Sequence, residues 1–347
     1  MKYEGDMKKV DIKSMLLTEL EDYFMSIGEQ KFRAKQVFFW LHEGVCEFAD
    51  MTNISNGLRE KLGEAFYITQ PEIVEKQKSE IDGTIKYLWR LNDGETVESV
   101  LMEYKHGTTV CISSQVGCRM GCQFCASSIG GLVRNLSASE MLDQVLFAQI
   151  DSDKRISNIV LMGMGEPLDN FDSVVKFIRL ITHPEGINIG ARHITISTCG
   201  IIEYIDKLSE LDVQLTLAIS LHAPDDETRN KIIPTNRTVG VERLIEAGDK
   251  FFKTTGRRIT YEYAMIDNIN DSAQHAHKLA SLLSSTKSHL NIILLSNIPN
   301  TQFQATSQGT LKKFTNILDK SDVSYTLRRS LGADIEAACG QLRNRAK

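Results

Sequence analysis

The chain has 347 residues, of which 42% are hydrophobic and 24% charged, and this composition excludes a disordered chain, a collagen and a coiled coil. No apolar run approaches the roughly 18 residues of a membrane helix, and the first residues lack the apolar core of a secretory signal. The formal net charge of −5 argues against non-specific coating of nucleic acid, although a local basic face can still bind phosphate. We therefore expect a soluble, cytoplasmic protein with no membrane partner.

The N-terminal part of the chain, residues 1–72, has the pattern of a small helical domain. Apolar residues recur at helical spacing over 16–27, 31–42 and 56–66. Three cations surround Phe32 in the second of these segments. They are interpreted either as a solvated helix face or as part of a surface that binds RNA phosphates.

Strand patterns replace helical ones in the following segment, which we expect to be a β-meander extension over residues 73–107. Residues 84–91 and 95–103 are short and rich in β-formers, and a third strand is expected over 108–114. Asp-Gly pairs supply turns before the first two strands. The third strand leads into the main domain, residues 108–347.

Strands and helices then alternate, which is typical of an α/β fold with a parallel sheet and outer helices. Further strands are expected at 157–162, 193–198, 215–221, 259–265, 290–295 and 323–328. Helices are expected at 138–149, 171–181, 241–253, 273–283 and 310–318. Six or seven such units predict a partial (β/α) barrel of the triosephosphate-isomerase type. In that architecture the chemistry takes place at the carboxyl ends of the strands.

Three of the seven cysteines follow the strand at 108–114 in the pattern C-x₃-C-x₂-C. They are Cys118, Cys122 and Cys125. An odd number of cysteines without an export signal makes a disulfide framework improbable. Closed zinc sites normally take four protein ligands, whereas a [4Fe–4S] cluster on three cysteines keeps one iron open for another ligand. A zinc or redox loop is the alternative.

This spacing, with Phe124 before the last cysteine, resembles the signature of the radical S-adenosylmethionine (SAM) superfamily. The resemblance implies one [4Fe–4S] cluster per chain on the three cysteines, with SAM chelating the open iron. Residues 162–167, after the next expected strand, resemble the superfamily motif that holds the SAM amino group. Gly165 and Glu166 are its matching positions.

Further segments extend the resemblance to the RlmN/Cfr family, whose members methylate adenine in RNA. The similar segments are residues 111–118, 163–168, 196–198, 220–224 and 337–342. RlmN-type members act at C2 of an adenine in the peptidyl-transferase centre of 23S rRNA, and some also act on tRNA. Cfr-type members act at C8. Residues 126–131, 190–194 and 255–258 are closer to RlmN-type sequences, so C2 methylation is expected, with C8 as the alternative.

The resemblance also implies a covalent route that uses two SAM molecules per turnover. The first SAM methylates Cys339, and the second yields the 5′-deoxyadenosyl radical that activates this methyl group for addition to the adenine. Glu98 then removes the ring proton. Cys111 attacks the sulfur of Cys339, and a transient Cys111–Cys339 disulfide is left for a thiol to reduce. Taken alone, either cysteine would be interpreted as structural and Glu98 as solvent-facing.

The family places several further residues against SAM. The matching positions are Gly165, Glu166, Ser197, Ser220, Leu221, His222 and Asn297. The sequence departs from the family around the last of these, because an ungapped alignment puts Ser296 at the contact position and only a shift of one residue restores Asn297. The other cysteines, Cys46 and Cys199, match no functional position and are assigned to packing.

The remaining expectations concern partners. An electron donor such as flavodoxin or ferredoxin and a monomeric state follow from the resemblance. A basic RNA-binding surface around the barrel mouth is expected from Arg192, Arg229, Lys231, Arg237, Arg257, Arg258, Arg328, Arg329, Arg343 and Arg345. The competing hypothesis from another class is a non-catalytic RNA- or metal-binding protein with a structural cysteine loop. It leaves Glu98, Cys111 and Cys339 unexplained.

Overall fold

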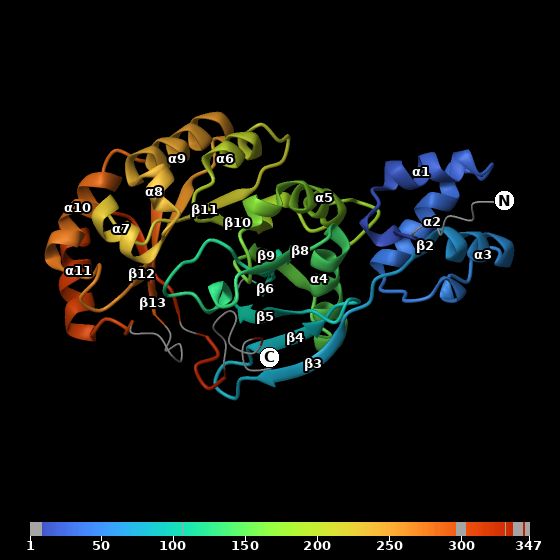
Figure 1. Ribbon diagram of the computed structural model, residues 1–347, viewed down its shortest axis with the longest axis horizontal. Helices are drawn as coiled ribbons and strands as arrows, with labels where there is room; N and C mark the ends of the chain where they lie inside the picture. The colour runs from blue at the N-terminus through green and yellow to red at the C-terminus, as the bar shows by residue number, and fades with distance from the viewer. Residues whose placement is uncertain (1–8, 106, 296–302, 330, 336–342, 344–347) are drawn as a thin grey trace, which may run out of the picture.

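A computed structural model describes residues 9–105, 107–295, 303–329, 331–335 and 343 (Figure 1). Three helices, α1 (Leu17–Ser26), α2 (Lys31–His42) and α3 (Asn56–Ala65), pack together at one end of the molecule. The short strands β1 (Val10–Asp11) and β2 (Phe66–Tyr67) pair in parallel beside them. The predicted helices of this segment are therefore confirmed.

One ten-stranded sheet runs through the rest of the described chain, in the order β14-β13-β12-β11-β10-β9-β6-β5-β4-β3. Its strands are β3 (Glu72–Lys78), β4 (Ile85–Arg90), β5 (Thr96–Tyr104), β6 (Gly107–Cys111), β9 (Ile156–Leu161), β10 (Ile194–Thr198), β11 (Thr216–Ser220), β12 (Ile259–Met265), β13 (Ser288–Leu294) and β14 (Tyr325–Leu327). All pairings from β6 to β14 are parallel, whereas β3, β4 and β5 pair antiparallel. The sheet is open, with β14 and β3 at its edges, so the predicted partial α/β barrel with a β extension is confirmed.

Helices cover the outer face of the parallel strands (Figure 1). They are α4 (Ala138–Ser152), α5 (Phe171–Ile181), α6 (Ile202–Ser209), α9 (Val241–Thr255), α10 (Ala273–Leu283) and α11 (Gln308–Lys320). Two short helices, α7 (Asp226–Ile232) and α8 (Asn236–Val239), lie in the loop after β11. No helix in the described ranges has the length and hydropathy needed to cross a membrane.

Several elements were not predicted. Strand β3 reads EIVEKQK and is largely exposed, so its sequence lacks the apolar alternation of a half-buried strand. Helices α6, α7 and α8 have only eight, seven and four residues, so each offers few repeats of a helical apolar pattern. The strand expected at 108–114 ends at Cys111, and the chain continues into a separate hairpin of β7 (Gln115–Gly117) and β8 (Leu132–Asn135). This hairpin encloses the cysteine loop.

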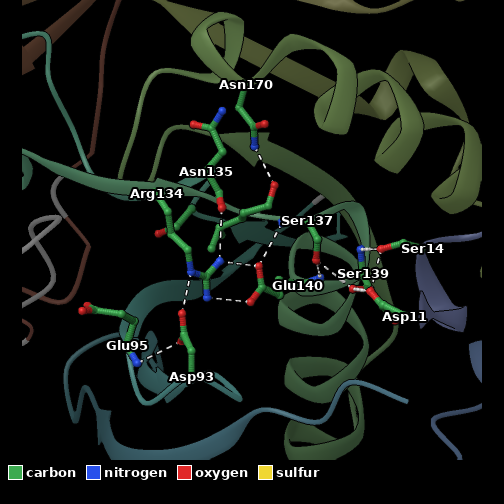
Figure 2. Close-up of polar contacts among 12 residues, drawn as sticks. Asp11, Ser14, Asp93, Glu95, Arg134, Asn135, Ser137, Ser139, Glu140 and Asn170 are labelled. Atoms are coloured by element: carbon green, nitrogen blue, oxygen red, sulfur yellow. Dashed lines mark hydrogen bonds and ion pairs between the residues drawn. The ribbon is translucent and has the colours of Figure 1, made fainter. Parts of the chain in front are cut away.

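A polar network fixes the hairpin to the elements around it (Figure 2). Arg134 of β8 donates a hydrogen bond of 2.6 Å to Asp93 in the β4–β5 turn and forms a bidentate pair of 2.9 Å bonds with Glu140 of α4. Asn170 donates to the carbonyl oxygens of Ser114 and Leu136, at 2.9 and 2.8 Å. Bidentate arginine–carboxylate bonds are directional, so this network holds the base of the cysteine loop in a defined position.

Buried polar groups join the N-terminal helices to the barrel. Lys13 Nζ lies 2.6 Å from Asp143 Oδ1 of α4, and both side chains are almost completely buried. His42, at the end of α2, is 5% exposed and packs against Gly186, where a Cβ atom would lie only 2.7 Å from the imidazole ring. Burial lowers the pKa of His42 to about 4. The folded protein therefore keeps this imidazole neutral at physiological pH.

The His42 site predicts an acid-sensitive contribution to stability. Between pH 6.5 and 4 the unfolded chain binds a proton at His42 that the folded chain does not bind, so the free energy of unfolding falls as the pH falls through this window. Replacing His42 by Asn should flatten that dependence by up to about 1.4 kcal/mol per pH unit. Urea unfolding at several pH values measures it. The exposed His277, changed to Asn, is the control, and equal slopes in H42N and the unchanged protein would contradict the prediction.

Candidate active site

A cavity of about 300 Å³ opens at the carboxyl ends of the parallel strands, where the α/β architecture predicts the chemistry. It brings together most of the predicted metal and cofactor residues from four separate segments of the chain. These lining residues are Cys118, Cys122, Cys125, Gly165, Glu166, Ser197, Ser220 and His222. Leu221 does not line it, since its side chain is fully buried in the main core. Asn297 and Cys339 lie outside the described residues.

The cysteine loop is held on both sides of the cavity. On one side the Cys118 amide donates to the Gly131 carbonyl, at 3.1 Å. On the other, the Gln123 amide donates to the Ile232 carbonyl at the end of α7, at 2.9 Å. Phe124 packs edge-on against His222, with ring centroids 5.0 Å apart. The loop therefore bridges the β7–β8 hairpin and the strand ends.

The three thiols of the loop lie close enough for the charge of one to influence the pKa of another. Burial raises the pKa of Cys118 to about 12 and raises that of Cys122, and each is raised further by the neighbouring cysteines. Within the described ranges no three His, Cys, Asp or Glu side chains converge closely enough to hold a metal ion. The loop thus gathers the donors at one cavity, and a metal centre would have to stabilise them as thiolates.

The glycine-rich segment after β9 approaches the backbone of the β6–β7 connection very closely. A Cβ atom on Gly163 would lie 2.6 Å from the Ile112 carbonyl oxygen, and Gly165 has φ +103°. Glu166 is buried: its carboxylate accepts from the Leu168 amide at 3.0 Å and from the Cys199 amide at 2.8 Å. Burial raises the pKa of Glu166, and these amide bonds oppose the shift. The carboxylate is thereby held in place at the cavity wall.

We expect Gly163→Ala to be destabilising, because the added methyl group meets backbone atoms that cannot rotate away. The expected cost is about 1–3 kcal/mol, the usual range for overpacking. Gly190→Ala is the matched control, since a Cβ atom there meets nothing closer than 3.6 Å. Thermal unfolding of both variants tests the prediction, which fails if their Tm values are equally close to that of the unchanged protein.

His222 occupies a strained, buried position after β11, at the cavity wall. Its φ is +54°, its Nδ1 accepts from the Ala264 amide at 2.9 Å, and its carbonyl accepts from Asn270 Nδ2 at 2.7 Å. Burial and the nearby Arg229 charge lower its pKa to about 3. The imidazole is therefore neutral, with its proton on Nε2.

The predicted catalytic residues Glu98 and Cys111 lie on the same face of the sheet. Val100 pairs with Cys111 across β5 and β6, and Cys111 pairs in turn with Val160 of β9. Side chains paired across strands share a face, and Glu98 lies two residues before Val100 on that face. Cys111 packs there with Met162, which also lines the cavity.

Glu98 is a buried carboxylate with two identified contacts. Its Oε2 lies 2.8 Å from Lys86 Nζ of the neighbouring strand, and its Oε1 accepts from the backbone amide of Arg343 at 2.8 Å. All three residues are 2% exposed or less. This burial rules out the alternative in which Glu98 is a solvent-facing strand glutamate. The carboxylate is held against Arg343, four residues beyond Cys339 in the chain.

Glu262 lines the cavity but was not singled out from the sequence. Arg328, expected in the basic surface, lies beside it, and both residues also line a second cavity of about 520 Å³ inside the barrel. Burial raises the pKa of Glu262, against the Arg328 charge. Glu262 could have been found from the sequence, because it is a carboxylate within the largely apolar strand predicted at 259–265. Cys199, assigned to packing, also lines the first cavity.

The predicted basic surface is only partly supported by side-chain positions. Arg229 and Arg343 are buried at 0% and 1% exposure, so they are not surface cations. Arg192, Arg257 and Arg258 precede β10 and β12, which puts them near the amino ends of strands, opposite the cavity. Lys231 and Arg237 are exposed in the loop after β11, on the cavity side. Arg345 lies outside the described residues.

Comparison with known proteins identifies the class first. Residues 112–280 match the Radical SAM superfamily, and residues 10–68 match the Ribosomal RNA large subunit methyltransferase N-terminal domain. The fold agrees: a crystal structure of a radical SAM methyltransferase from Sphaerobacter thermophilus superposes with a TM-score of 0.91 at 40% identity, covering 96% of this chain and 98% of that one.

The full-length relatives specify the family. A probable dual-specificity RNA methyltransferase RlmN of Alkaliphilus metalliredigens is 49% identical over 339 residues, covering 98% of this chain and 96% of the relative. The corresponding protein of Clostridium tetani is 49% identical over 336 residues, with 97% and 96% covered. The chain belongs to the RlmN family of radical SAM RNA methyltransferases.

Membership in the superfamily implies SAM and a [4Fe–4S] cluster as cofactors. The residues present fit these groups. Thiols are the ligands of iron–sulfur clusters, and the three cysteines of one loop line the same cavity as the buried carboxylate of Glu166. The predicted family and enzyme class are thus confirmed, and an RNA substrate is implied by the family.

Proposed function

We propose that this chain methylates C2 of an adenine in 23S rRNA and of an adenine in tRNA. The observation that carries this proposal is the convergence at one end of the barrel: the cysteine loop and Glu166 line the cavity, while Glu98 and Cys111 occupy the adjoining inner face of the sheet. Residues 1–72 would bind RNA, 73–107 would carry Glu98, and 108–347 would form the core. The enzyme would act as a monomer, in the cytoplasm.

Three parts of the site have distinct proposed roles in binding. Cys118, Cys122 and Cys125 hold one cluster, and the Gly165–Glu166 edge binds the SAM amino group. Ser197, Ser220, Leu221, His222 and Asn297 make the remaining contacts. When bound, with electrons from a donor such as flavodoxin or ferredoxin, the two cofactors supply radical chemistry that an unactivated aromatic carbon requires. Neutral His222 suits this role, because it adds no charge beside a cationic ligand.

The chain's own residues would carry the methyl group and the proton. Cys339 accepts a methyl group from a first SAM, and a second SAM is consumed when that group is activated and joined to the adenine. Glu98, held by Lys86 and the Arg343 amide, removes the ring proton. The Cys111 thiolate then attacks the sulfur of Cys339, which releases the methylated base and forms a Cys111–Cys339 disulfide. A thiol reductant reopens that disulfide.

The experiment that tests the proposal combines metal analysis with methyl transfer. Protein purified without oxygen should contain about four irons and four sulfides per chain, as expected for one cubane cluster. With SAM carrying a labelled methyl group, label should appear in rRNA and tRNA. One zinc per chain and no labelled RNA would instead support a non-catalytic binding protein.

A further inference from the structure

Arg229, on α7, is a guanidinium buried at 0% exposure beside the cavity. Its Nε donates to the Leu221 carbonyl at 2.9 Å and its Nη1 to Asn236 Oδ1 at 2.6 Å. Its Nη2 donates to the carbonyls of Cys199 and Ser220, at 2.7 and 2.8 Å. All four acceptors are neutral, so they accept hydrogen bonds from the guanidinium without balancing its charge.

No carboxylate in the described part of the chain forms an ion pair with Arg229. The acidic residue that influences it is Asp226, which is exposed and accepts a hydrogen bond of 2.9 Å from Asn236. A buried charge without an opposite partner is costly, and proteins retain such charges where they are paired or serve a site. The burial of Arg229 therefore points to an anion that joins the site.

The cysteine loop lies on the side of α7 where such an anion would sit. The Gln123 amide donates to the Ile232 carbonyl of α7, and Cys122 packs against the small apolar cluster that contains Ile232 and Ile233. The Arg229 charge lowers the pKa of Cys122, against the larger effect of burial. A [4Fe–4S]²⁺ core on three thiolates carries a net negative charge, which increases on reduction.

We propose that Arg229 is the buried counter-cation of the cluster and a positioning residue for the strand ends that face SAM. This inference rests on the proposed cofactor assignment. A nearby cation stabilises the electron that the cluster accepts, so it raises the reduction potential. Through its bonds to Leu221, Ser220 and Cys199, the same side chain couples that charge to the cavity wall.

The test is an anaerobic redox titration of the reconstituted cluster, followed by electron paramagnetic resonance and carried out without RNA. R229Q should titrate at a more negative potential than the unchanged protein, whereas R229K, which keeps the charge, should stay close to it. R257Q is the matched control. Arg257 also donates hydrogen bonds beside β11, but at its opposite end, to the Leu215 carbonyl and to the side-chain Oγ1 of Thr216.

A charge exchange covers the case in which R229Q does not fold. The double variant D226N/N236D preserves net charge and an amide–carboxylate hydrogen bond between the two positions, but it moves the carboxylate directly against Arg229. The arginine charge is then neutralised in place. The cluster potential should again become more negative, as in R229Q.

The outcomes separate this inference from the proposed function. An unchanged potential in folded, cluster-loaded R229Q or D226N/N236D would overturn the role of Arg229, as would an equal shift in R229K and R229Q. A potential shift in a protein that methylates no RNA would sustain the Arg229 role and contradict the proposed function. If the unchanged protein takes up no iron, both are overturned.

Discussion

Glu98→Gln should reduce methylation by about 10²- to 10⁴-fold, the usual contribution of a positioned general base. The amide has nearly the shape of the carboxylate and can still accept the Arg343 amide hydrogen bond, but it has no charge for the ring proton or for Lys86, 2.8 Å away. In the proposed mechanism methyl transfer to Cys339 precedes the proton step, so S-methylcysteine should still form. Peptide mass spectrometry for that modification, beside an RNA methylation assay, measures both.

A stability control is needed because breaking a buried ion pair costs about 3–5 kcal/mol. Asp143→Asn provides it: the Lys13–Asp143 pair is as buried as Lys86–Glu98, but it joins η1 (Ile12–Ser14) to α4, away from the cavity. Both variants should lose comparable stability in urea. D143N should keep most of its activity at a temperature where it is folded. If D143N and E98Q lose activity in parallel, Glu98 has no catalytic role.

Cys122→Ser should remove iron and all methylation together. A serine hydroxyl does not ionise near neutral pH, so the loop would offer two thiolates where a [4Fe–4S] cluster needs three protein ligands in addition to SAM. The iron-to-protein ratio and the visible absorption of the anaerobic protein measure the loss. The folded state should persist, because Cys122 is only partly buried and packs at the edge of a small apolar cluster.

Two other cysteine variants distinguish the loss of a cluster ligand from the general effect of removing a thiol. Cys46→Ser changes a half-buried thiol whose sulfur contacts the Gly44 carbonyl, far from the cavity in the fold, and should retain iron and activity. Cys199→Ser changes a thiol that lines the same cavity but lies at the end of β10. It should retain iron. Iron loss in C199S and retention in C122S would refute the three-cysteine assignment.

Much of the fold was predictable because hydrophobic period and turn residues agree locally. The strand at 259–265 and the helices at 171–181 and 273–283 have the predicted bounds. Strand β3 was missed because pairing with β4, rather than an apolar pattern of its own, holds it in the sheet. Tertiary pairing of this kind cannot be read from local sequence.

The residues of the candidate site were predictable where a sequence motif fixes their spacing. They were less predictable where a residue's role depends on whether the fold buries it. Cys118, Cys122, Cys125 and Glu166 come together at one cavity as the motifs imply. Arg229 was expected on the surface, because a cation in a helical segment is usually solvated. Its burial depends on carbonyl groups supplied by two other strand ends. The roles of Cys339 and Asn297 stay predictions, since both lie outside the described residues.

The most direct test of the central claim is the identity of the methylated nucleoside. RNA from a host that lacks its own enzyme, with and without this chain, would be digested and analysed by mass spectrometry, with rRNA and tRNA kept separate. The account predicts additional 2-methyladenosine in both RNA fractions, and its loss in E98Q. Additional 8-methyladenosine in place of 2-methyladenosine, or unchanged nucleosides from a protein shown to carry its cluster, would contradict it.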